Sequence, residues 1–188
     1  MAAIRSLLRW AAGAAAALPL LAAAQVDSKA CTLLLLAGKG NPQPLVAMAR
    51  KVQASCANAR SIAPGELAKA VKDARQQGAK RLILVGQGVG ANAALAFAGS
   101  SGDTDGVVAL GGEAAANEFG ALPALAAGIK QHVPLLWLVP AGDPLAARGE
   151  DYAFAKAPPH PASRFVPFKG DAAEAGARLV LDWLKALD

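Results

Sequence analysis

A run of glycines lies in the middle of an otherwise aliphatic stretch of the chain. Gly86-Gln87-Gly88-Val89-Gly90 follows the apolar segment 82–85 and precedes the alanine-rich segment 91–98, which indicates a tight turn between a strand and a helix. Amides that open a helix attract anions, and Lys39 on a neighbouring loop would add a positive charge. The alternative is that the glycines only let the strand pass closely into the helix. Both interpretations stay open, and the candidate ligand-binding residues are Gly38, Lys39, Gln87, Gly88 and Val89.

The same turn also fits the permissive pattern of a dinucleotide-binding turn. Gly86-x-Gly88-x-x-Ala91 satisfies G-x-G-x-x-G/A, and Glu113 follows the next predicted strand, where a ribose-binding acid would lie. In dinucleotide-binding domains this turn follows the first strand, whereas here it follows the third. We therefore predict no cofactor and keep dinucleotide binding as a minor alternative.

Hydrolysis by a serine would need a hydroxyl nucleophile, a base within hydrogen-bond reach and a group that orients the base. Ser61 comes near the end of the predicted second strand and is the best-placed hydroxyl. Ser100 and Ser101 follow the helix after the glycine turn, so we expect them at the opposite edge of the sheet.

The two histidines are badly placed for a base at the same site. His132 and His160 each precede a predicted strand, so we expect them where strands begin rather than where they end. Asp143 does follow a strand, but an aspartate before Pro144 is also typical of a turn. We predict that neither histidine is catalytic.

Apolar runs and amphipathic stripes alternate along the chain and predict the elements that position these residues. Short apolar runs predict strands over 32–36, 82–85, 107–110, 133–139 and 164–168, and the more polar segment 57–62 is a weaker strand candidate. Helical periodicity predicts helices over 45–52, 64–77, 91–98, 122–129 and 172–187. The last helix has Asp171 as N-cap, with Glu174 completing a capping pattern. This alternation predicts an α/β fold: a three-layer, doubly wound domain with a mostly parallel sheet of about six strands and a ligand site at their carboxyl ends.

The segment from Arg81 to Leu95 resembles the strand, elbow and helix of the α/β-hydrolases, whose pattern G-x-S-x-G holds the serine nucleophile on a strained turn. Gly86 and Gly90 match the flanking glycines, and Gly88 occupies the serine position. The resemblance extends over most of the chain after residue 24. It implies an α/β-hydrolase-like domain that lacks the first two strands of the family.

The resemblance also assigns positions to the rest of the family's site. Ala37-Gly38 occupies the oxyanion loop, usually His-Gly, and Asp143 stands where the acid belongs. The family places its histidine between the last strand and the last helix, but residues 168–172 contain none. We therefore predict a degenerate member without serine-hydrolase activity, which binds a small ligand, an anion for example, or a protein partner. The alternative is an active esterase whose nucleophile is displaced, with Ser61 as the candidate.

Residues 1–24 have the features of a cleaved export signal. Arg5 and Arg9 form a basic start, residues 10–21 are apolar, and Ala22-Ala23-Ala24 fits a small-residue cleavage site. The alternative is a membrane anchor, but the apolar run is shorter than the roughly 20 residues that a span requires. We predict a signal peptide over 1–24, a single domain over 25–188, and a periplasmic or secreted location in a bacterium.

The cysteines Cys31 and Cys56 lie at the start of the first predicted strand and just before the second. If these strands are parallel neighbours, both cysteines lie at one edge of the sheet, within reach of a disulfide. Export favours the disulfide over two buried free thiols.

Composition and charge exclude several classes of protein. The 188 residues are 54% hydrophobic with a formal net charge of +5, which excludes a disordered chain. The lysines and arginines are scattered, so we expect no nucleic-acid partner, and we expect no membrane span once the signal is removed. Two histidines and two cysteines are few for a metal enzyme, and Asp103 and Asp105 before Gly106 are more typical of a turn than of a calcium loop. We predict no metal site.

Overall fold

The computed structural model describes residues 30–37, 42–111, 133–143 and 160–187. The predicted signal segment and the predicted helix 122–129 lie outside these residues. The described elements run in the order β1 (Cys31–Leu36), α1 (Gln43–Lys51), β2 (Asn58–Ile62), the short 3-10 helix η2 (Pro64–Glu66), α2 (Leu67–Gln76), β3 (Arg81–Gln87), α3 (Val89–Ser100), β4 (Gly106–Leu110), β5 (Leu135–Pro140), β6 (Arg164–Phe168) and α6 (Ala172–Lys185).

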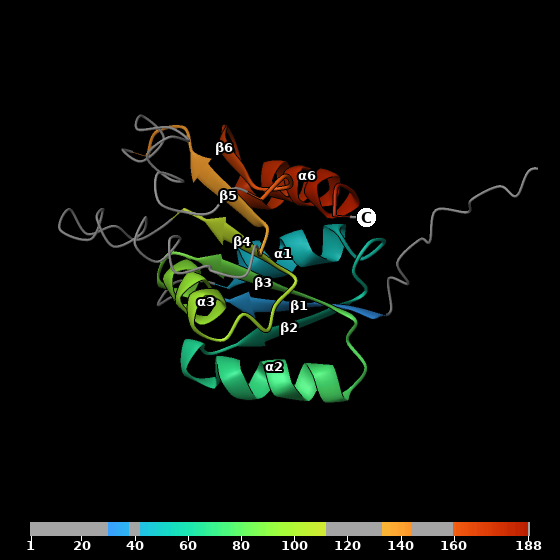
Figure 1. Ribbon diagram of the computed structural model, residues 1–188. Coiled ribbons are helices and arrows are strands. Elements are labelled where there is room, and N and C mark those ends of the chain that lie inside the picture. The colour runs from blue at the N-terminus through green and yellow to red at the C-terminus, as the bar shows by residue number, and fades with distance from the viewer. Residues whose placement is uncertain (1–29, 38–41, 112–132, 144–159, 188) are drawn as a thin grey trace, which may run out of the picture.

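The six strands form one sheet in the order β2-β1-β3-β4-β5-β6, and every neighbouring pair is parallel. All strand arrows therefore share one direction in Figure 1. The chain passes from β1 outward to β2 and then returns across β1 to β3. The strand order therefore changes direction between β1 and β3, although the strands themselves stay parallel. The carboxyl ends of β1 and β3 lie side by side there, with Leu36 in register with Gly86.

Helices cover both faces of the sheet, which gives the three-layer α/β fold expected from the alternation of strands and helices (Figure 1). Successive residues of β1 alternate between the layers: Leu34 and Leu36 pack with α2 and α3, whereas Leu33 and Leu35 pack with α1 and α6. This is why β1 is a continuous apolar run, since a strand covered on both faces has no solvent-facing side.

Most predicted boundaries differ from the observed ones by one or two residues, and at two of them proline is the reason. The helix predicted from Pro64 starts with the 3-10 turn η2, and the α-helix begins at Leu67. The strand predicted from Val133 begins at Leu135, because Pro134 has no N–H to give to a strand ladder.

The last helix is capped as expected at its first residue but not by a full capping box. The Asp171 carboxylate accepts hydrogen bonds from the backbone N–H groups of Ala173 (2.7 Å) and Glu174 (3.0 Å). The Glu174 side chain instead accepts from Lys51 Nζ at 2.8 Å, so it joins α6 to α1 across the surface.

The disulfide is confirmed: Cys31 and Cys56 are bonded, with their Cα atoms 4.8 Å apart, and both are fully buried. It joins the start of β1 to the segment that enters β2, at the edge of the sheet where the strands begin. Within the described part of the chain, no helix is long and apolar enough to cross a membrane.

Candidate functional site

The glycine turn is a strand-to-helix elbow. β3 ends at Gln87, α3 begins at Val89, and Gly88 alone joins them with φ 55° and ψ −124°. Glycine adopts this backbone conformation without the strain that a Cβ would impose. In the elbow of a hydrolase this is the residue that would carry the nucleophile, and here it has no side chain.

The two flanking glycines are required by close packing. A Cβ at Gly86 would collide with the backbone of Gly90 and Ala91, which means that strand and helix are pressed together at the turn. A Cβ at Gly90 would collide with the backbone carbonyl of Leu36 at the end of β1. The spacing Gly86-x-Gly88-x-Gly90 is therefore explained by the elbow itself, without a dinucleotide.

The elbow lies at the point where the sheet reverses its strand order, beside the end of β1. In open α/β sheets, ligands bind outside the carboxyl ends of the strands at such a point. Ala37, at the predicted oxyanion position, is partly exposed directly after β1. Gly38 and Lys39, which were predicted to bind a ligand, lie outside the described residues.

The start of α3 offers backbone donors and one apolar side chain at this edge. Helix geometry leaves the first N–H groups, those of Val89 and Gly90, without intrahelical acceptors, whereas Ala91 and Asn92 donate to the Gly88 carbonyl at 2.9 and 3.3 Å. Val89 is 37% exposed, unlike the other large apolar residues of the described part of the chain. Gln87 is half-buried beside it.

Asn92 was not singled out in the sequence, although it is the one polar side chain in the apolar helix segment 91–98. Its Oδ1 atom is buried and has no hydrogen-bond partner, one helical turn after Gly88. A buried polar atom without a partner is costly, and such atoms are uncommon in folded proteins.

Asp143 shares the carboxyl edge with the elbow but not the same strand pair. It follows β5, and β4 lies between β5 and the elbow strand β3. Its backbone N–H donates to the Pro140 carbonyl at 2.8 Å, which closes a tight turn after the strand. The turn interpretation therefore describes the Asp143 backbone.

The candidate hydroxyls are not at the elbow. Ser61 is exposed on β2 and pairs in register with Leu35 of β1, so the whole of β1 separates it from β3, a distance of about 10 Å at normal strand spacing. Ser100 and Ser101 lie at the far end of α3, about 18 Å along the helix axis from the elbow. Both hydroxyls donate to the Phe97 carbonyl, at 3.1 and 3.3 Å.

Of the two histidines, His132 lies outside the described residues and His160 lies at the amino edge of the sheet. His160 precedes β6, and its Nδ1 accepts a hydrogen bond from the backbone N–H of Ala162 at 3.1 Å. The loop between β6 and α6 carries Asp171 as a helix cap in place of a histidine.

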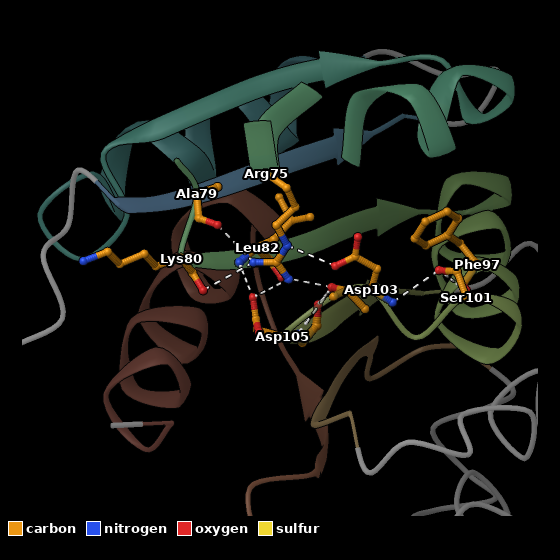
Figure 2. Close-up of polar contacts among 10 residues, drawn as sticks. Arg75, Ala79, Lys80, Leu82, Phe97, Ser101, Asp103 and Asp105 are labelled. Carbon is orange, nitrogen blue, oxygen red and sulfur yellow. Dashed lines mark hydrogen bonds and ion pairs between the residues drawn. The ribbon is translucent and has the colours of Figure 1, made fainter. Parts of the chain in front are cut away.

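Asp103 and Asp105 are held by an arginine (Figure 2). Arg75 Nε lies 3.0 Å from Asp103 Oδ1, and Arg75 Nη2 lies 2.9 Å from Asp105 Oδ2. Asp105 Oδ2 also accepts from the backbone N–H of Leu82 at 2.7 Å. The two carboxylates thus shape the turn before β4, as the turn interpretation expects.

The sequence was compared with protein families and curated proteins, and the fold with solved structures. No protein-family model matches the sequence, and no curated protein matches it. Among solved structures, the esterase domain of a Rhodothermus marinus protein is similar at TM-score 0.61 and 15% identity, over 84% of this chain and 87% of that one. A monoacylglycerol lipase from Paleococcus ferrophilus (0.56, 13%, over 84% and 95%) and a proline iminopeptidase-related protein from Thermus thermophilus (0.52, 16%, over 86% and 91%) are also similar. The chain has the α/β-hydrolase fold.

Proposed function

We propose that this protein is an exported α/β-hydrolase-fold protein that has no serine-hydrolase activity and binds a small ligand at the elbow. The observation that carries the proposal is Gly88, which occupies the turn between β3 and α3 with φ 55° and has no side chain to attack a substrate. The similar esterase and lipase structures share the fold, but a shared fold does not by itself imply a shared activity.

The surroundings of Gly88 support the absence of catalysis. A substitute nucleophile would have to lie within reach of a base, yet Ser61 is two strands away and His160 is at the other edge of the sheet. Asp143 is at the carboxyl edge, but no histidine among the described residues accompanies it there, and an aspartate alone does not activate a hydroxyl.

The elbow nevertheless keeps the features that bind ligands in this fold. The Val89 and Gly90 N–H groups, which have no acceptor within the helix, favour an anion or a polarised carbonyl oxygen. The exposed Val89 side chain lies beside them and favours an apolar group on the same ligand. A small carboxylate with a short apolar tail combines both properties, and Gly38 and Lys39 are the further residues proposed to contact it. A protein partner would contact the same residues.

Two features support export. Residues 1–24 read as a signal peptide, and the buried Cys31–Cys56 disulfide is typical of proteins that fold outside the reducing cytoplasm. Amino-terminal sequencing of the protein purified from the cell envelope tests this directly. We expect Gln25 as the first residue, and an intact Met1 in that fraction would contradict cleavage.

A fluorophosphonate probe separates the proposal from its main alternative, an active esterase with a displaced nucleophile. We expect no covalent labelling and no turnover of short-chain p-nitrophenyl esters by the purified protein, with an active serine esterase as positive control. Labelling that disappears in Ser61→Ala would show that Ser61 is the nucleophile and would overturn the proposal.

Ligand binding at the elbow is tested by amide chemical shifts in a titration with hexanoate, and with hexanol as the neutral match. We expect saturable shifts of the Val89 and Gly90 amides with hexanoate alone. An absence of shifts at residues 86–92 with hexanoate would contradict the proposed ligand class. NAD and NADP are titrated in parallel, and a saturable shift at Gly86 or Gly88 would favour dinucleotide binding.

A further inference from the structure

A polar groove lies near the amino ends of β1 and β2, away from the elbow. It runs between the edge strand β2 and the end of α2. Its volume is about 400 Å³, and its lining includes Thr32, Asn58, Arg60, Ala74, Gln77 and Ala79. Figure 1 shows α2 beside β2, with the end of α2 on the side of the molecule away from α3. The groove exists because α2 faces it with small or polar side chains, and because no further strand pairs with β2 among the described residues.

Three of the lining side chains come from neighbouring strands and share one face of the sheet. Thr32 and Asn58 are register partners in the parallel pair β1–β2, and Arg60 is two residues further along β2. Leu34 and Ile62 pack against the α2 side, so the alternation of strand side chains puts Thr32, Asn58 and Arg60 on that side too. Gln77 joins them from the end of α2.

Arg60 is the only charged residue of the groove lining, and no ion pair between described residues involves it. The neighbouring Arg75 is different, because two aspartates and two backbone carbonyls already engage its guanidinium. Lys69 and Asp73, on the same helix, pair with each other at 3.5 Å. Among the described residues, the groove lining therefore carries one positive charge that has no ion-pair partner.

Thr32 is the one buried polar residue of the groove lining. The residue is 7% exposed on a strand that is otherwise fully apolar from Leu33 to Leu36, and no hydrogen bond of its hydroxyl exists among the described residues. Its hydroxyl oxygen is not among the fully buried, unpartnered side-chain atoms of the described residues, so it is accessible from the groove and can bond to a molecule there.

We propose that this groove binds a small hydroxylated carboxylate, of the size of a sugar acid. The planar guanidinium of Arg60 matches a carboxylate in a bidentate geometry. The Gln77 amide and the Thr32 hydroxyl can both donate to and accept from ligand hydroxyl groups, whereas Asn58 Nδ2 already donates to the Cys31 carbonyl at 3.2 Å. A volume of about 400 Å³ is within the range of small-molecule sites. The site is distinct from the elbow and does not depend on the proposed function.

The test is an amide chemical-shift titration of the disulfide-bonded protein with glucuronate, and with glucose as the neutral match. We expect saturable shifts for Asn58, Arg60 and Gln77 with glucuronate alone. Arg60→Gln should raise the Kd at least about tenfold, since it removes a charged hydrogen-bond donor. Thr32→Val keeps the shape of the side chain and should raise the Kd about fivefold.

Arg178→Gln is the matched control, because Arg178 is exposed on α6, on the other face of the sheet. It should leave the Kd unchanged. The proposal is overturned if glucose binds as well as glucuronate, if Arg60→Gln and Arg178→Gln have equal effects, or if no saturation occurs. Shifts confined to residues 86–92 would place glucuronate at the elbow and would also overturn it.

Discussion

The two edges of the sheet are built from different chemistry. At the carboxyl edge, where the strands end, the chain places glycines and small residues: Ala37, Gly86, Gly88, Gly90 and Gly111. Contacts there are close backbone approaches, such as Gly90 against the Leu36 carbonyl, and backbone hydrogen bonds, such as the Gly111 N–H to the Leu138 carbonyl at 2.7 Å. Side chains that could do chemistry are sparse among the described residues of this edge.

The amino edge, where the strands begin, is instead held by side chains. The Cys31–Cys56 disulfide closes one end of it, and Arg75 with its two aspartates ties α2 to the turn before β4. Thr104 Oγ1 bridges the carbonyls of Leu82 and Gly106 at 2.9 and 3.0 Å. At the far end, Trp183 Nε1 donates to the Ala162 carbonyl at 2.7 Å and ties α6 to the loop before β6.

Side-chain bonds therefore stabilise the amino edge, whereas close backbone packing stabilises the carboxyl edge. Substitutions at the amino edge should reduce stability by removing bonds. Substitutions at the elbow should reduce it by adding atoms where none fit. The predictions below test this division by free energies of unfolding from urea denaturation.

The largest effect should come from the disulfide. Replacing both cysteines (Cys31→Ala with Cys56→Ala) should lower the free energy of unfolding by about 3–4 kcal/mol, because the crosslink restrains about 25 residues in the unfolded chain. The unmodified protein under reducing denaturing conditions is the control and should behave like the double variant. A loss below about 1 kcal/mol would show that the amino edge does not depend on this crosslink.

The elbow should tolerate added atoms poorly. Gly90→Ala should cost about 3 kcal/mol, since its Cβ collides with a backbone carbonyl that cannot rotate away. Gly65→Ala is the matched control: nothing lies within 4 Å of a Cβ there, and we expect a change within about 0.5 kcal/mol. Equal effects at the two glycines would remove the argument that strand, helix and β1 meet tightly at the elbow.

Sequence patterns predicted most of this fold because each pattern reports a local physical requirement. The run from Leu33 to Leu36 reports burial on both faces, and the stripe Leu67, Ala70, Val71 and Ala74 reports the buried side of α2. The strand at 57–62 gave the weakest signal, because its residues are exposed or half-buried and so lack the apolar run of a covered strand. The 3-10 start at Pro64 was not foreseen, since a proline begins either kind of helix.

The candidate site was only half predictable for the same reason. Gly86, Gly88 and Gly90 could be placed because an elbow fixes their spacing. The unpartnered Oδ1 of Asn92 and the groove at Arg60 could not, because they depend on how elements distant in sequence pack together. The sequence signal for Asn92 was a single amide in an alanine-rich helix, which is weak without a structure.

A smaller effect is expected at the centre of the elbow. Gly88→Ser should lower the free energy of unfolding by about 2 kcal/mol, because a residue with a Cβ must then adopt the backbone angles φ 55° and ψ −124°. The variant restores the hydrolase pattern but supplies no base, so it should remain unlabelled by a fluorophosphonate. Labelling of Gly88→Ser would show that a base lies nearer the elbow than His160, and the carboxyl edge would no longer count as chemically bare.

The smallest effects should separate two aspartates that contact the same arginine. Asp105→Ala should cost about 1–2 kcal/mol, because it leaves the backbone N–H of the buried Leu82 without its 2.7 Å acceptor. Asp103 makes a more exposed pair, so Asp103→Ala should cost less than about 1 kcal/mol. High salt screens exposed charges but does not replace a buried acceptor, so the Asp103 effect should fade in high salt while the Asp105 effect persists. If high salt removes both effects, the contacts of Arg75 with the two aspartates are surface charge pairs and do not stabilise the sheet.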